Sequence, residues 1–206
     1  FCRLVEALRS GAPLRSCAGV SFRENGRTVS AADRPNITDL SVIPSPYLTG
    51  LIDLKDKTVV DVPLETTRGC SFRCRYCYYH KNFPKLRFFP LKRVEAELKY
   101  ILRHRPTEVY LMDATFNADH GRAMEILGLF KKYNRGSSLH VELMAEMVDE
   151  PMARALAEAN ASQIEIGLQS ADAAVLAAVR RPFNQERFRR GIALLNRYGV
   201  LYEIQL

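Results

Sequence analysis

The chain has 206 residues, of which 47% are hydrophobic and 26% are charged, proportions typical of a globular protein with a substantial core. No stretch approaches the roughly 18 consecutive apolar residues that a membrane-spanning helix requires. Thirty lysines and arginines against 23 acidic residues give a net charge of +7. Because the basic residues are spread along the chain, they indicate an ordinary basic surface and argue against a nucleic-acid partner.

The five cysteines are unevenly distributed, since three of them fall within residues 70–77. An odd number with this clustering argues against a disulfide framework. It favours metal ligation in a reducing compartment, so we expect a cytoplasmic protein.

The first 60 residues differ in pattern from the rest of the chain. Residues 1–9 have the apolar spacing of a helix that Gly11 ends, and residues 20–29 form a predicted hairpin with the turn Asn25-Gly26. Three prolines between residues 35 and 46 then predict an extended linker. The chain begins without an initiator Met, so we expect the natural protein to be longer on that side.

From residue 61 onward, short apolar runs alternate with segments of helical periodicity. The predicted strands are residues 60–66, 108–112, 139–144, 163–168 and 201–206, and the predicted helices are residues 91–104, 118–133, 150–159, 171–179 and 185–198. This alternation predicts an α/β fold with a parallel sheet, either an open doubly wound sheet or a barrel. The last strand ends with the chain, so we expect at least one further unit in the full protein.

The motif with the clearest chemistry is Cys70, Cys74 and Cys77, spaced C-x3-C-x2-C directly after the first of these strands. Sites in parallel α/β folds form at the carboxyl ends of strands. Thiolates suit iron–sulfur clusters and zinc, and three of them leave one iron of a four-iron cluster open for a ligand. A Cys3His zinc site with His80 is the structural alternative, although such sites usually hold together modules that lack a core.

This cysteine spacing, with the aromatic Tyr76 before the last cysteine, resembles the signature of the radical S-adenosylmethionine (SAM) superfamily. The resemblance implies a partial (β/α)6 TIM-like barrel, of which residues 61–206 would supply about five units. It also implies a [4Fe-4S] cluster on the three cysteines that cleaves SAM reductively, giving a 5'-deoxyadenosyl radical that attacks a substrate. Such an enzyme is oxygen-sensitive and needs a low-potential electron donor such as a flavodoxin or ferredoxin.

The resemblance further implies that SAM lies against the loops after the later strands. Asp113, Ala114 and Thr115 would contact its amino group, although the family segment there is usually rich in glycine. The same stretch could instead begin the next helix, with Asn117 or Asp119 as its N-cap.

The third predicted strand carries Glu142, and a carboxylate within a covered sheet needs a partner. The resemblance implies that Glu142, with Glu146 as a second candidate, lies near the ribose or methionine end of SAM. A plain salt bridge is the structural alternative for Glu142.

Gln169 and Ser170, after the fourth strand, resemble the segment that contacts the ribose hydroxyls, which an amide can serve as donor and acceptor. Ser170 could also cap the next helix. Arg181, in preference to Arg180, would pair with the SAM carboxylate, with charge compensation at the helix end as the alternative. Tyr76 would pack near the adenine.

Residues 65–70 (ETTRGC) and 43–47 (IPSPY) resemble the cobalamin-binding branch of the superfamily. Residues 1–60 would then be the tail of an N-terminal cobalamin-binding domain with its linker, although they contain no cobalamin-ligating motif and could simply cap the barrel. The branch implies methyl transfer or a radical rearrangement on a substrate that the sequence does not identify. The competing prediction is a methylthiotransferase acting on RNA, whose second cluster would need more upstream cysteines than Cys2 and Cys17.

Overall fold

The structure, a computed structural model, describes residues 1–55 and 60–206 and divides into two compact units, Phe1–Thr38 and Asp39–Leu206. The predicted linker therefore ends earlier than residue 60, and its last residues, 56–59, lie outside the described part of the chain. Residues 39–55 belong to the second unit because Leu40, Tyr47 and Leu54 are buried in its core.

The first unit contains the predicted helix and hairpin. Helix α1 (Cys2–Ser10) ends at Gly11, and a 3-10 turn η1 (Leu14–Ser16) follows. Strands β1 (Ser21–Glu24) and β2 (Arg27–Ser30) pair antiparallel. Their turn residues Asn25 and Gly26 have φ angles of 50° and 75°, the positive values that a two-residue hairpin turn of this kind requires.

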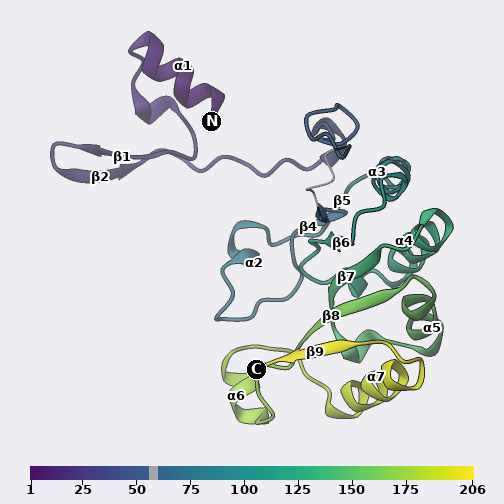
Figure 1. The fold of residues 1–206 in the computed structure, drawn as a ribbon. Coiled ribbons are helices and arrows are strands. Elements are labelled where there is room, and N and C mark those ends of the chain that lie inside the picture. Colours follow the sequence, from purple (N-terminus) through teal and green to yellow (C-terminus); the bar gives the residue numbers. More distant parts are fainter. Residues whose placement is uncertain (56–59) are drawn as a thin grey trace. The chain divides into compact units, whose positions relative to one another are not determined.

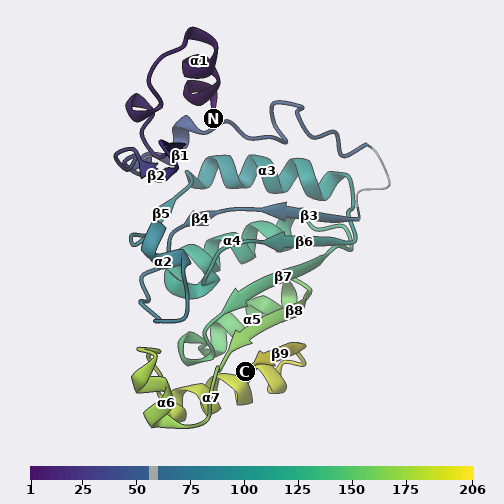
Figure 2. The same cartoon turned by 90° about the vertical axis from the view of Figure 1, so that its left-hand side faces the viewer.

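The second unit is built on a five-stranded parallel sheet in the order β3-β6-β7-β8-β9, which follows the chain (Figure 1 and Figure 2). The strands are β3 (Asp61–Leu64), β6 (Glu108–Leu111), β7 (Ser138–Leu143), β8 (Ala161–Gly167) and β9 (Tyr202–Gln205). The helices that cover one face are α3 (Leu91–Arg103), α4 (His120–Tyr133), α5 (Glu150–Glu158) and α7 (Gln185–Arg197) (Figure 1). Helices on a single face are the arrangement of a barrel, because a doubly wound sheet has them on both.

The apolar core lies between the sheet and these four helices. Helix α3 contributes Val94, Leu98, Ile101 and Leu102, whose spacing produces one buried stripe. Alternate strand residues meet this stripe, and those pointing the other way are polar. The buried apolar residues of the three central strands are Val109, Leu111, Leu139, Val141, Leu143, Ala161, Ile164 and Ile166.

Helix α4 of the second unit begins later than predicted, and several short elements were not predicted. Helix α4 begins at His120 because the Asp119 side chain accepts the Arg122 N–H (3.0 Å), as the capping alternative anticipated. Helix α6 (Ala173–Ala178) lies within the predicted helix 171–179. The short elements that were not predicted are η2 (Leu40–Val42), β4 (Thr67–Arg68), α2 (Tyr79–Asn82), β5 (Arg87–Phe88), η3 (Phe116–Ala118) and η4 (Ala145–Met147).

Helix α7 approaches the loop after β7 unusually closely. A Cβ atom on Gly191 would lie 2.0 Å from the Ala145 carbonyl oxygen, well inside van der Waals contact. Glycine at this position therefore fixes α7 against η4, at the end of the sheet where the candidate site lies.

Candidate functional site

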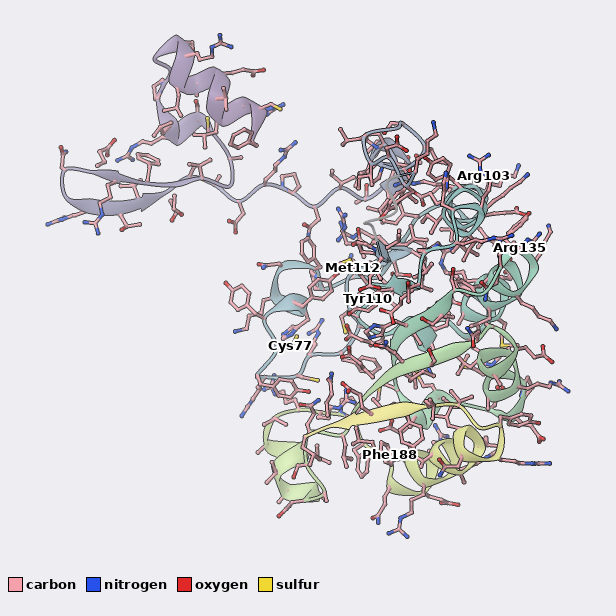
Figure 3. The ribbon with its side chains drawn as sticks, viewed as in Figure 1. Cys77, Arg103, Tyr110, Met112, Arg135 and Phe188 are labelled. Atoms are coloured by element: carbon pink, nitrogen blue, oxygen red, sulfur yellow. The ribbon has the colours of Figure 1, made fainter. Side chains whose placement is uncertain are left out.

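A cavity of about 420 Å³ opens at the carboxyl ends of the parallel strands. It lies between the loop that follows β4 and the ends of β6 to β9, and Cys77, Tyr110 and Met112, which line it, are marked in Figure 3. All three motif cysteines contribute to its wall, with Cys74 buried and Cys70 and Cys77 partly buried. The fold thus brings the cysteine motif to the edge of the sheet where α/β enzymes hold their ligands.

The backbone around Gly69 determines where the cysteine loop begins. Gly69 has a φ of 107°, and a Cβ atom there would lie 2.1 Å from the Lys85 carbonyl oxygen, so only glycine fits. The Cys70 N–H donates to the Phe83 carbonyl (3.1 Å). The middle of the loop is fixed by the Arg75 N–H, which donates to the carbonyl of Val179 beyond α6 (2.8 Å).

The donor set fits an iron–sulfur cluster. Burial raises the pKa of the Cys70 thiol, whereas hydrogen bonds from the Phe72 N–H and the Thr115 hydroxyl favour its thiolate. Among residues 1–55 and 60–206, no three Cys, His, Asp or Glu side chains gather around a single-ion position. The three cysteines instead surround one cavity, as a cluster with one thiolate per iron requires.

Most of the predicted SAM contacts also line this cavity. They come from five segments of the chain, strand β7 and four loops, and are Tyr76, Ala114, Thr115, Glu142, Gln169 and Arg181. Arg181 donates from Nη2 to the Gly167 carbonyl, while its buried Nε has no partner among the described residues. An arginine held by one nitrogen and unsatisfied at another can receive a carboxylate.

Asp113 and Ser170 are absent from the residues that line the cavity. The Asp113 side chain is buried and accepts the N–H groups of Thr66 and Thr67, each at 2.8 Å, together with the Thr66 hydroxyl. Ser170 accepts the N–H of Asp172 (3.0 Å), and Asp172, rather than Ser170, caps helix α6. Asp113 therefore fastens the base of the cysteine loop.

The two neighbouring arginines point into different hollows. Arg181 lines the cysteine cavity, whereas Arg180, with a φ of 55°, lines a separate surface depression. Glu146 lies outside the cavity lining, and burial raises the pKa of its carboxyl, with the charge of Arg181 acting in the opposite direction. Of the alternatives considered, Arg181 and Glu142 are the ones that face the site.

A polar network on the concave face of the sheet was not predicted. The Tyr110 hydroxyl donates to Glu142 Oε1 (2.6 Å), and the Tyr110 ring stacks on His140 with centroids 4.1 Å apart. His140 Nδ1 and Nε2 lie 3.1 Å and 2.8 Å from carboxylate oxygens of Glu108 and Glu165. Glu142 thus has a tyrosine as its hydrogen-bond partner, and the salt bridge that was the structural alternative for it does not occur among the described residues.

Two tyrosines of the cavity have perturbed hydroxyls. Burial, together with a hydrogen bond to Cys74, raises the pKa of Tyr76 to about 12. Burial and the Glu142 carboxylate raise the pKa of Tyr110. Both phenols therefore remain protonated and act as hydrogen-bond donors near neutral pH.

A parallel barrel that presents three cysteines on the loop after its first strand defines a radical SAM type of enzyme. Residues 64–204 match the radical SAM superfamily, and the chain belongs to this superfamily, whose members use SAM and a [4Fe-4S] cluster. The predicted family and fold are thereby confirmed.

Two proteins of similar sequence are named as methyltransferases. The chain is 26% identical over 205 residues to the uncharacterized methyltransferase PH0819 of Pyrococcus horikoshii, covering 97% of this chain and 44% of that protein. It is 30% identical over 105 residues to the cobalamin-dependent radical SAM methyltransferase TokK of Streptomyces tokunonensis, covering 48% of this chain and 15% of TokK. The chain thus spans less than half the length of either relative.

Solved structures share the fold at lower sequence identity. The radical SAM methyltransferase TsrM of Kitasatospora setae, solved with cobalamin and a [4Fe-4S] cluster, superposes with a TM-score of 0.76 at 16% identity. The match covers 98% of this chain and 44% of TsrM.

Within the described residues, no helix has the length and apolar character that a bilayer crossing demands.

Proposed function

We propose that this chain is the catalytic portion of a cobalamin-dependent radical SAM methyltransferase. The observation that carries the proposal is the meeting of Cys70, Cys74 and Cys77 with the unsatisfied Arg181 in one cavity at the strand ends. A cluster held by these cysteines and a SAM bound beside it would supply an electron and a 5'-deoxyadenosyl radical.

The side chains around the cavity divide the binding of SAM among them. Arg181 would pair with the carboxylate through its planar fork, and Thr115 and the backbone of Ala114 would meet the amino group. Glu142, oriented by Tyr110, would accept a hydrogen bond from a hydroxyl or amine of SAM. Gln169 and Ser170 would serve the ribose, although Ser170 would have to move toward the cavity.

Cobalamin enters the proposal through the relatives. TokK is named as cobalamin-dependent, and the TsrM structure contains cobalamin. PH0819 and TsrM both match across nearly the whole chain, which supports assigning the first unit, residues 1–38, to the end of a cobalamin-binding domain and its linker. Residues 39–206, the second unit, would then be the radical SAM core, which begins earlier than the expected residue 61. Their names favour methyl transfer over a radical rearrangement.

The reducing chemistry implies the remaining properties. A low-potential carrier such as a flavodoxin or ferredoxin would supply the electron, and five free cysteines agree with a cytoplasmic setting. The substrate stays unspecified, because none of the cavity residues dictates one.

The test is anaerobic reconstitution of the protein followed by metal and product analysis. We expect iron, sulfide and a broad visible absorbance, and formation of 5'-deoxyadenosine from SAM under a strong reductant. Cys74→Ala should abolish this cleavage, whereas the exposed Cys2→Ala should leave it unchanged. Zinc at the three cysteines, or continued cleavage by Cys74→Ala, would refute the proposal; S-adenosylhomocysteine formed with substrate would distinguish methyl transfer from rearrangement.

A further inference from the structure

A second hollow lies directly behind the cysteine loop and is strongly basic. Its volume is about 630 Å³, and its lining residues are Arg73, Arg75, His80, Lys81, Pro84 and Arg180. We call it the basic hollow. It shares no lining residue with the cysteine cavity, so a partner seated in it would leave the SAM site accessible.

The charges of the basic hollow are not neutralised by the protein. Arg73, Arg75, Lys81 and Arg180 are exposed, and none of them forms an ion pair within residues 1–55 and 60–206. Other exposed lysines are paired, as Lys131 is with Glu158 at 2.9 Å. Unpaired like charges around a concavity create a positive potential that attracts an acidic partner.

The backbone holds the residues that carry these charges beside the cluster ligands. Arg73 and Arg75 flank Cys74 in the sequence, and the Arg75 N–H is hydrogen-bonded to the Val179 carbonyl (2.8 Å), next to Arg180. Any partner that neutralises these arginines approaches the cysteine loop closely. Electrons pass quickly between proteins only over short distances, so this is where a donor should dock.

We infer that the basic hollow is the docking surface for an acidic one-electron carrier protein. The inference rests on the proposed function and adds to it the place where the reductant binds. Each productive encounter oxidises the carrier by one electron and reduces the cluster on the three cysteines by one. Exposed Tyr78 (67%), which lies next to Cys77 and outside the cysteine cavity, favours a protein partner, since tyrosine is enriched at protein interfaces.

The chain offers a matched control at the other end of the barrel. A second basic depression is lined by Lys99, Arg103, Arg105, Tyr133 and Arg135, at the amino ends of β6 and β7. Figure 3 shows Arg103 and Arg135 on the opposite side of the sheet from Cys77. Reversing two charges there changes the net charge as much as reversing two in the basic hollow.

The experiment measures the affinity of the cluster-loaded protein for oxidised flavodoxin by calorimetry, at low and at high salt. Arg73→Glu combined with Lys81→Glu should weaken binding about tenfold or more at low salt, and high salt should shrink this difference. Arg103→Glu combined with Arg135→Glu should change the affinity less than about twofold. Equal affinities of the first variant and the wild type, equal losses in both variants, or tight binding of single-stranded RNA with no binding of flavodoxin would overturn the inference.

SAM cleavage driven by titanium(III) citrate separates this inference from the proposed function. The basic-hollow variant should cleave SAM at the wild-type rate with this small reductant and more slowly with reduced flavodoxin. Absence of SAM cleavage by the wild type would refute the proposed function. The measured affinities for flavodoxin would still show whether the basic hollow binds the carrier.

Discussion

Replacement of Asp113 by alanine should destabilise the protein because its carboxylate satisfies three buried donors. The N–H groups of Thr66 and Thr67 share Oδ1, and the Thr66 hydroxyl donates to Oδ2. A buried donor left without an acceptor costs about 1–3 kcal/mol, so the two backbone groups predict a loss of about 2–6 kcal/mol in the free energy of unfolding. Removing a buried carboxylate, whose pKa burial raises, offsets part of this loss.

Asp113→Asn tests whether the hydrogen bonds, rather than the negative charge, account for the stabilisation. Its amide oxygen can still accept both backbone N–H groups, and the Thr66 hydroxyl can rotate to accept from the new amide. We therefore expect a much smaller loss than for Asp113→Ala, measured by urea denaturation of both variants. Asp119→Ala, which removes the exposed N-cap of α4, is the control and should cost about 1 kcal/mol.

The same variants test how Asp113 acts. We expect Asp113→Ala to lose iron on reconstitution, because Thr66 and Thr67 lead directly into the cysteine loop, and Asp113→Asn to retain it. Equal losses of stability in Asp113→Ala and Asp119→Ala would refute the anchoring role. A stable Asp113→Asn protein with weakened SAM affinity would show that Asp113 contacts SAM, as the sequence had predicted.

Two further predictions concern packing and pH. Gly191→Ala should destabilise the protein by about 1–3 kcal/mol by overpacking against Ala145, whereas Gly128→Ala, in an open position of α4, should be neutral or stabilising by up to about 1 kcal/mol, both measured by denaturation. A destabilising Gly128→Ala would contradict this. Because burial raises the pKa of Glu146 above 4.5, its ionisation opposes folding, so wild-type stability should fall relative to Glu146→Gln as the pH rises above that value. Melting temperatures of the wild type and Glu146→Gln, measured as a function of pH, test this prediction. The same pH dependence in both proteins would refute it.

The sequence predicted the large elements well because their periodicity reflects burial. The stripe of α3 and the short apolar runs of the strands have a single explanation in a parallel α/β fold. It did not predict β4 and β5, since two-residue strands have no periodicity, nor the packing of Leu40 and Tyr47, which lie among prolines and resembled a linker. Contacts between segments distant in sequence determine both the pairing of β4 with β5 and the burial of Leu40 and Tyr47.

The sequence predicted some residues of the candidate site and missed others. Spacing alone identified Cys70, Cys74 and Cys77, because ligands on one loop are local in sequence. Nothing in the sequence distinguishes a carboxylate that points into a cavity from one that bonds its own loop, as Asp113 does. The partners of His140 come from neighbouring strands, so they become visible only once the strand register is known.

The polar concave face of the barrel has a consequence for how the protein can change over time. Stability resides in the packing between strands and helices, so exchanging Tyr110, His140 or Glu165 disturbs none of the apolar packing. Such exchanges carry little risk of unfolding, provided that each new polar group finds a partner, and those at Tyr110 and Glu165 reshape the wall of the cysteine cavity. The polar groups of this face can therefore be exchanged by a few substitutions while the scaffold stays the same.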